Sequence, residues 1–235
     1  NVLMSKIIRC KFKKENDMIY ISHLDLQRLL QRAFRRAEIQ LSYSQGFNPH
    51  PKMSYGHALA LGTESQGEYL DVEIEDDLTA DEFLTKINAT MPEGIEFIKA
   101  KEITKEVPSL ASTIEYGEYM FTLEVDKELS KEFVKTKVSD LMNQEQILIT
   151  KKNKKGKTVE VDIRPMIKTF DVIDVEDKVI TLEATMSTGS KANLNTNIFI
   201  PKMLEAFGLD IDPLDVDILR RELYIVKDGE LVTPM

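Results

Sequence analysis

The sequence predicts an α+β protein made of two tandem ferredoxin-like (βαββαβ) domains, each with an antiparallel sheet and helices packed on one face. The chain has 235 residues, which is long for one compact domain and enough for two domains of roughly 100 residues each. Residues 4–103 show the order strand, helix, strand, strand, helix, strand. A similar order recurs in residues 116–235, after a polar segment at 104–115 that we interpret as a linker.

The elements of the first half follow from local patterns. Apolar and basic side chains alternate in residues 6–13, which predicts a half-buried strand with a basic outer face. Ser22, with Asp25 three residues later, forms a capping-box-like start for a helix that runs to about Ala37. We expect further strands at residues 52–61, 68–76 and 95–103, and a second helix that begins after Thr79 and ends before Pro92.

The second half is predicted to be an enlarged copy of the first. A strand and a helix are expected at residues 119–125 and 129–142, and a short helix is expected to start at Pro201 and stop at Gly208. Two further segments form a hairpin around the lysine-rich turn KKNKKGK. The remaining strands, including those of the hairpin, are expected at residues 147–150, 159–163, 170–173, 179–186 and 223–226.

Composition excludes several classes of protein. The apolar fraction is 42%, and no apolar run approaches the roughly 18 residues that a membrane-spanning helix needs. The opening NVLM lacks the features of a signal peptide, so we expect a cytoplasmic protein that does not bind membranes. Cys10 is the only cysteine and is expected to be a small buried side chain. A single cysteine excludes a disulfide within the chain and a zinc or iron–sulfur site built on several thiolates.

Charge is unevenly distributed along the chain. The net charge is −9, yet residues 1–55 carry ten Lys or Arg against four Asp or Glu. A basic segment inside an acidic chain indicates a local anionic partner, although solvated charged faces are common.

Four arginines lie on the first predicted helix, away from its apolar stripe. Arg28, Arg32 and Arg35 are about one turn apart, a spacing that can follow successive phosphates of RNA, and Arg36 lies beside them. The alternative is a solvated helix face, or pairing with acidic residues such as Glu73.

A stiff loop follows this helix at residues 44–52. Gly46 permits a backbone conformation closed to other residues, two prolines restrict the chain, and Phe47 and His50 offer rings for stacking. In the alternative interpretation, Phe47 fills the edge of the core and Asn48 caps a turn. The loop residues that we assign to substrate or RNA binding are Gln45, Phe47, Asn48, His50 and Lys52.

The three histidines give no metal site by spacing. His23, His50 and His57 are not linked by a short ligand motif, so we expect neither a metal nor a cofactor. His50 is a candidate for a general acid or base in RNA cleavage, by analogy with ferredoxin-like RNA endonucleases.

Two segments carry a family resemblance. The run SHLDLQRLLQRAFRRAEIQLSYSQGFNPHPKMSYGHALALGTESQGEYLDVEI resembles the radical S-adenosylmethionine-linked proteins known as domain of unknown function 2344, and VDIRPMI resembles that family's second-half motif. The resemblance implies a bacterial protein fused to, or encoded beside, a radical S-adenosylmethionine enzyme. It adds Arg164 to the candidate binding residues, and it brings no established activity. The chain itself lacks the CxxxCxxC cluster motif.

These observations favour an accessory protein rather than an enzyme. We expect it to bind RNA, including a ribosome-related RNA, or another anionic substrate for a radical S-adenosylmethionine partner. The alternatives are an RNA-processing or RNA-modifying enzyme that uses His50, and a module that binds only protein.

Overall fold

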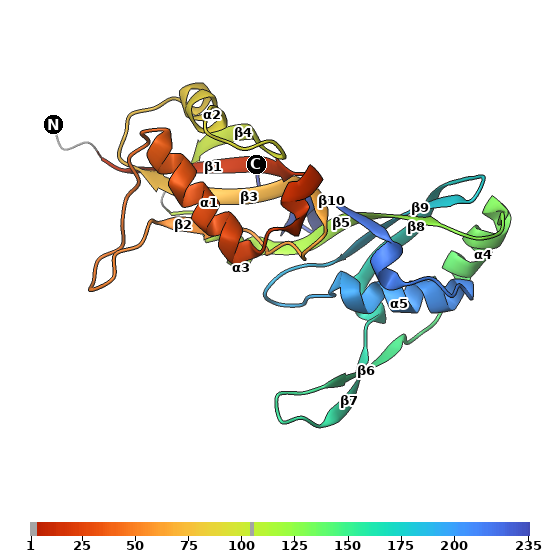
Figure 1. The fold of residues 1–235 in the computed structure, drawn as a ribbon. Coiled ribbons are helices and arrows are strands. Elements are labelled where there is room, and N and C mark those ends of the chain that lie inside the picture. The colour runs from red at the N-terminus through yellow and green to blue at the C-terminus, as the bar shows by residue number, and fades with distance from the viewer. Residues whose placement is uncertain (1–3, 104–105) are drawn as a thin grey trace. The chain divides into compact units, whose positions relative to one another are not determined.

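The computed structural model describes residues 4–103 and 106–235. The chain forms two compact units of mixed α+β structure (Figure 1). Unit 1 contains Asn1–Ile114 and Arg220–Met235, and unit 2 contains Glu115–Leu219. None of the helices within the described ranges is long and apolar enough to cross a membrane.

Unit 1 is built on a sheet in which β4 (Ile95–Ile103), β1 (Lys6–Lys14) and β3 (Glu64–Ile74) are neighbours, with β10 (Asp217–Lys227) beside β3. β1 is antiparallel to both of its neighbours, with Cys10 opposite Leu70 on β3 and Ala100 on β4. Two short strands complete the sheet. β2 (Met53–Tyr55) pairs with β3, and β11 (Glu230–Val232) pairs with β10.

Helices α1 (His23–Arg36) and α2 (Ala80–Asn88) cover one face of this sheet. The Ser22 side chain caps α1 by accepting a hydrogen bond from the Asp25 amide, and Thr79 and Glu82 form the expected capping box of α2. The predicted apolar stripe of α1 is buried against β1, β3 and β4. Cys10 is fully buried in the same core, and this burial raises the pKa of its thiol. The main interior is therefore the one that the sequence periodicity predicts.

Three short helices join these elements in both units. The 3-10 helix η1 (Asn16–Tyr20) leads from β1 to α1, and η2 and η3 lie in unit 2 at Arg164–Met166 and Pro213–Asp215. No helix was predicted at any of these three positions.

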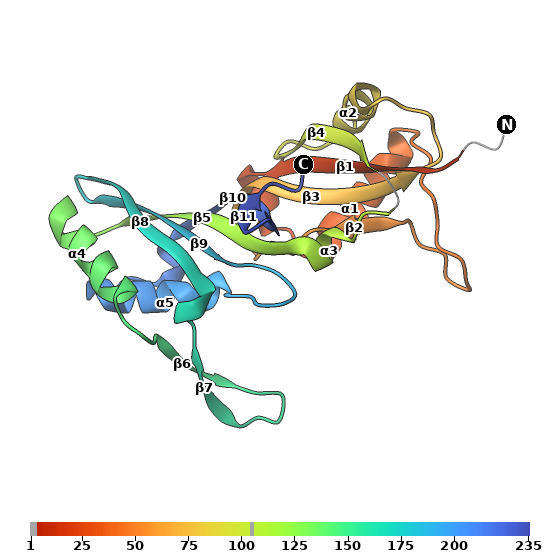
Figure 2. The ribbon, with the colours of Figure 1, turned by 180° about the vertical axis from the view of Figure 1, so that it is seen from behind.

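The main strands of unit 2 are β5 (Ile114–Glu124), β9 (Val179–Ser187) and β8 (Ile167–Glu176), which are neighbours in that order. Both pairs of strands are antiparallel. Helices α4 (Lys131–Met142) and α5 (Thr196–Phe207) lie beside these strands (Figure 2). Their buried apolar side chains form one core with those of the strands. Between α4 and β8 the chain makes a separate two-stranded ribbon, β6 (Leu148–Lys152) and β7 (Thr158–Asp162).

Helix α5 corrects one expected boundary. It begins at Thr196 and contains Pro201, whereas the sequence analysis places Pro201 at its start. The Asn195 side chain caps the helix by accepting a hydrogen bond from the Asn197 amide, so an earlier cap takes precedence over the proline. Gly208 ends the helix in the left-handed conformation, as expected.

Other boundaries also differ from expectation. β2 ends at Tyr55, and the carbonyls of His57 and Ala58 beyond it accept hydrogen bonds from the Arg220 guanidinium. Part of the expected linker is the short helix α3 (Leu110–Thr113), whose Leu110 is buried in unit 1. Residues 104–105 of that linker and 1–3 of the opening segment lie outside the described ranges. Arg220–Met235, expected in the second domain, belong to unit 1.

Candidate nucleic-acid interface and a buried polar cluster

The four arginines of α1 are all exposed. Arg28 lies 3.8 Å from the Asp25 carboxylate, and Arg36 donates to the Thr90 carbonyl at 3.1 Å. Arg32 and Arg35 make no ion pair with any residue in the described parts of the chain. Glu73, the alternative partner, is instead 3.4 Å from Lys52. Of the four cations, Arg32 and Arg35 are therefore not neutralised by an ion pair within the described parts of the chain. We call Arg28, Arg32 and Arg35 the arginine face.

The loop at 42–52 is held in one conformation and projects from unit 1 between α1 and β2 (Figure 1). The Ser44 amide donates to the His50 carbonyl at 2.9 Å, and the Lys52 amide donates to the Ser42 carbonyl at 2.8 Å. Gly46 has a φ of 131°, which a residue with a side chain rarely adopts. These bonds fix the loop independently of any ligand.

Phe47 extends from this loop into solvent, with a relative exposure of 106%. Its neighbours Gln45 and Asn48 are also exposed. The structure thus contradicts the alternative in which Phe47 fills the core edge. A fully exposed aromatic ring on an ordered loop is a surface on which a base can stack.

His50 helps to close the loop. Its Nδ1 atom lies 2.9 Å from the Ser44 hydroxyl and 3.4 Å from the Asn48 carbonyl, and its amide donates to the same hydroxyl at 3.1 Å. Neither partner of the ring is charged. A catalytic histidine is usually oriented and tuned by a neighbouring charged group, so this geometry gives His50 a role in loop conformation.

Arg164, the candidate taken from the second motif, lies in unit 2. Its Nε donates to the Met142 carbonyl at the end of α4 at 3.1 Å, and its Nη1 donates to the Ile167 carbonyl at the start of β8 at 2.9 Å. The Asp162 carboxylate accepts hydrogen bonds from the Arg164 and Ile147 amides. Arg164 therefore connects the end of α4 to the start of β8 through hydrogen bonds, at the base of the β6–β7 ribbon.

The basic outer face expected for the first strand is neutralised in the structure. Arg9 makes two hydrogen bonds to the Asp71 carboxylate, at 2.8 and 2.9 Å, and donates to the Pro234 carbonyl at 3.0 Å. Lys11 lies 2.6 Å from Glu222. Because each of these cations already has a carboxylate, this sheet face is a poor site for an anion.

A buried polar cluster in unit 1 was not predicted. Arg220, with 1% of its side chain exposed, binds the Glu68 carboxylate through Nη2 at 2.7 Å and Nε at 3.1 Å. The Ser65 hydroxyl donates to the same carboxylate, and Lys14, also buried, donates to the Ile21 carbonyl at 3.1 Å. The alternation of side chains along the strands could have predicted the burial of two of these residues. Lys14 is two positions from the buried Phe12, and Glu68 is two positions from the buried Leu70, so each points to the same face as its buried neighbour.

The cluster encloses a small pocket with room for about one water molecule, lined by His23, His57 and Tyr55 as well as Lys14 and Glu68. The His23 ring meets the Tyr55 ring edge-on, with their centroids 5.1 Å apart. The Tyr55 hydroxyl is buried without a hydrogen-bond partner among the described residues. Because it has room for about one water molecule only, the pocket is too small for a substrate.

Both histidines in this pocket have lowered pKa values. Burial is the main cause for each, and the positive charge of Arg220 lowers the pKa of both rings further, while Glu68 opposes it. Burial also raises the pKa of the Tyr55 hydroxyl. At neutral pH the two imidazoles and the phenol are therefore uncharged.

We expect this pocket to make unit 1 less stable in mild acid. An unfolded histidine titrates near 6.5. Because the folded-state pKa values of His23 and His57 are lower, the unfolded chain takes up protons first as the pH falls through about 6.5. The free energy of unfolding should fall in that window, and the measurement is amide hydrogen exchange in β1 and β3 between neutral and mildly acidic pH.

A matched pair of variants tests the assignment. The double variant His23→Gln with His57→Gln should flatten the pH dependence of exchange in this window. His50→Gln, at an exposed histidine of the same unit, should leave it unchanged. An unaltered slope in the double variant would show that other groups cause the acid sensitivity.

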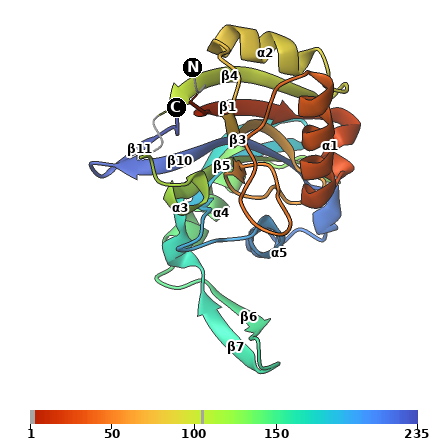
Figure 3. The same ribbon diagram turned by 90° about the vertical axis from the view of Figure 1, so that its left-hand side faces the viewer.

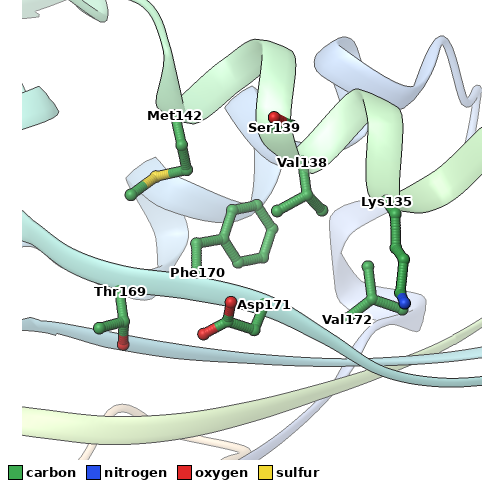
Figure 4. A pocket seen from close by; sticks show the side chains of 8 residues that line it. All are labelled: Lys135, Val138, Ser139, Met142, Thr169, Phe170, Asp171 and Val172. Atoms are coloured by element: carbon green, nitrogen blue, oxygen red, sulfur yellow. The ribbon is translucent and has the colours of Figure 1, made fainter.

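A second hollow lies in unit 2 between α4 and β8. Figure 4 shows Val138, Met142 and Phe170 facing one another across it, with the Lys135 side chain beside Val172. Asp171 also lines the hollow, so its polar groups carry both signs of charge. Val138 and Phe170 in its wall belong to the core of unit 2. The polar lining residues are exposed and carry charges of both signs, which gives no selectivity for an anion.

Among the described residues, no group of three or more His, Cys, Asp or Glu side chains is placed to hold a metal ion. The fold and surfaces define a mixed α+β protein with mostly antiparallel strands, a cationic helix and an exposed aromatic loop. The chain belongs to the family of domain of unknown function 2344 (DUF2344), described as uncharacterised proteins conserved in bacteria. The family model matches residues 7–196.

The solved structures that this chain is similar to are distant from it. The chain is similar to chains of an archaeal box H/ACA sRNP Nop10–Cbf5 complex (9% identity, TM-score 0.45) and a Cbf5–Nop10–Gar1 complex (8%, 0.47). It covers 91% of its own length in both, but less than half of those chains, 46% and 47%. The chain is also similar to a structure described as an unknown protein from Galdieria sulphuraria, at 10% identity with a TM-score of 0.27, with 95% of this chain and 100% of that chain covered. No curated protein matches the sequence.

Proposed function

We propose that this protein is a non-catalytic accessory protein that binds single-stranded RNA through unit 1. The arginine face of α1 would contact phosphates, and the 42–52 loop would stack a base on Phe47. The observation that supports this most directly is the exposure of Arg32 and Arg35 without an ion-pair partner in the described chain. Uncompensated cations on one helix face repel one another, so a polyanion that binds there gains favourable charge interactions.

The loop adds an element that phosphate contacts lack. Single-stranded nucleic acid is commonly bound by a cationic groove together with aromatic rings on which bases stack, and each stacked base contributes about 1–3 kcal/mol. Phe47 is fully exposed on a loop that directly follows α1 in the chain. The pairing of cations with an exposed ring favours RNA over a ligand that carries only charge.

The mode of binding differs from that of the common ferredoxin-like RNA-binding modules. We interpret both units as ferredoxin-like, a view supported in unit 1 by the element order β1, α1, β2, β3, α2, β4. RNA-recognition motifs stack bases on aromatic residues of the open sheet face. Here ion pairs such as Arg9–Asp71 occupy that face, so the helix and loop are the better surface.

The partner is a further part of the proposal. The resemblance of the SQGFNPHPK and VDIRPMI segments to radical S-adenosylmethionine-linked proteins supports a role in presenting RNA to such an enzyme. The His50 contacts favour this accessory role over catalysis by the chain itself. Copurification of the full chain with a radical S-adenosylmethionine enzyme from the same bacterium tests the partnership.

Replacing Arg28, Arg32 and Arg35 with alanine should strongly weaken the binding of single-stranded RNA. Three lost phosphate contacts at about 0.7 each should reduce the slope of log affinity against log salt by about 2. The measurement is a filter-binding titration of total bacterial RNA and of a single-stranded oligonucleotide at low and moderate salt.

The control removes the same charge from the same unit. Lys86, Lys99 and Lys101 are exposed on α2 and β4, and their triple alanine variant should keep the wild-type affinity and salt slope. Equal losses of RNA affinity in the two variants would show that the net charge of the unit, and not the arginine face, determines binding. Absence of binding in the wild type would favour the protein-interaction alternative.

A further inference from the structure

The β6–β7 ribbon of unit 2 is a second cationic surface, distinct from the arginine face. Its two strands pair with each other and with no third strand in the described chain, and the ribbon extends away from the rest of unit 2 (Figure 3). The segment KKNKKGK, which covers the end of β6 and the turn, places five exposed lysines near the tip of the ribbon: Lys151, Lys152, Lys154, Lys155 and Lys157.

We propose that this ribbon binds the phosphate backbone of double-stranded nucleic acid without reading its sequence. The inference goes beyond the function proposed for unit 1 and does not rest on it. Lysine is a point charge on a flexible stem, suited to phosphate contacts rather than to the bidentate recognition of bases. The shared chemistry is that of an RNA or a DNA duplex.

The turn has a defined conformation that displays the lysines. The Asn153 side chain accepts hydrogen bonds from the Lys155 and Lys157 amides, at 2.9 and 3.0 Å. The Gly156 amide donates to the Asn153 carbonyl, and Gly156 takes a φ of 73°, as a hairpin turn with a glycine bulge requires. Adjacent strand residues such as Lys151 and Lys152 point to opposite faces, so the cations surround the tip.

Within the described ranges, no carboxylate lies at ion-pair distance from these charges. None of the five lysines makes an ion pair with a described residue. The Asp162 carboxylate is engaged by the Ile147 and Arg164 amides at the base of the ribbon. Five uncompensated cations in seven residues repel one another, an arrangement that a dense polyanion relieves. A duplex carries one negative charge per about 1.7 Å of its axis.

The base of the β6–β7 ribbon is attached to unit 2 by side-chain contacts. Ile149 and Val161, which are opposite each other in the ladder, pack against the core of unit 2. Arg164 fastens the chain where the ribbon ends, through the carbonyls of Met142 and Ile167. An isolated two-stranded ribbon is only marginally stable in water, and these contacts support it.

The side chains of the ribbon favour a nucleic-acid duplex over single strands and lipid surfaces. Residues 148–162 contain no aromatic side chain, so the ribbon lacks the stacking surface that single-stranded sites use. The tip also lacks the large apolar side chains with which interfacial segments enter a lipid surface. The phosphate backbone of a duplex can be bound without an aromatic stacking surface and without large apolar side chains.

The test replaces the five lysines with glutamine in the full chain and retains Asn153 and Gly156. A short RNA duplex and a DNA duplex of the same sequence are the probes, with affinities measured over a range of salt. If four lysines contact phosphates, the salt slope should fall by about 3 to 4, and low-salt affinity should fall by at least about tenfold. A preference for one duplex would identify the source of the phosphates.

A matched variant replaces five other exposed lysines of unit 2, namely Lys127, Lys131, Lys135, Lys168 and Lys178, and should bind the duplexes as the wild type does. The ribbon variant should keep its affinity for single-stranded RNA, and the arginine-face variant should keep its affinity for duplexes, so the two proposals fail separately. Equal salt slopes in both lysine variants, or stronger wild-type binding to anionic vesicles than to either duplex, would overturn the inference.

Discussion

Replacing Glu68 with alanine should lower the free energy of unfolding of unit 1 by about 3–5 kcal/mol. The Glu68 carboxylate makes two hydrogen bonds to Arg220, whose side chain is 1% exposed, and accepts a third from Ser65. Removing the carboxylate leaves the guanidinium in a buried site without the charge that bonds to it twice. Amide hydrogen exchange in β1 and β3 measures the loss in unit 1 alone.

Two controls separate charge pairing from the loss of a side chain. Asp77 forms an exposed ion pair with Lys6 at 3.2 Å, and Asp77→Ala should cost less than about 1 kcal/mol. The double variant Glu68→Leu with Arg220→Met removes both buried charges and should recover much of the lost stability. A double variant no more stable than Glu68→Ala would contradict the assignment to charge pairing.

Replacing Gly94 with alanine should destabilise unit 1 for a different reason. Gly94 has a φ of 96°, and a Cβ atom there would lie 2.5 Å from the Glu15 carbonyl oxygen and 2.9 Å from Met18 Cγ. The Glu15 amide also donates to the Gly94 carbonyl at 2.8 Å, so the two backbones cannot separate freely. Strained backbone and overpacking together should cost about 2–6 kcal/mol, measured by amide exchange in β1 and β4.

Gly62 provides the matched control. It also has a positive φ, of 80°, but a Cβ atom there would meet nothing within 4 Å. Gly62→Ala therefore carries only the backbone cost, about 1–3 kcal/mol. Equal effects at Gly62 and Gly94 would show that the close approach to Glu15 contributes nothing.

The candidate surface was partly predictable because its members are defined by local sequence. Spacings of three and four divide α1 into an apolar stripe and an arginine face, and the structure confirms the exposure of the arginines. Gly46 and the two prolines marked a stiff loop, but they did not determine whether Phe47 is buried. That depends on whether another element covers the ring, and the described structure leaves it fully exposed.

Arg164 shows the limit of a motif. The segment VDIRPMI identified the residue, but its guanidinium binds the Met142 and Ile167 carbonyls. These acceptors become available only because α4 ends and β8 begins beside it. The role of the side chain is therefore decided by neighbours that the motif does not contain.

The sequence by itself determined the mixed α+β class, α1 with its Ser22 cap, the capping box of α2, the burial of Cys10 and the lysine-rich hairpin. All of these depend on residues within a few positions of one another. Only the tertiary structure decided that Arg220–Met235 return to unit 1 and that Arg220 pairs with Glu68, 152 residues earlier. A buried charge takes its partner from whichever strand packs beside it, and strand order is set by the burial of whole faces rather than by local pattern.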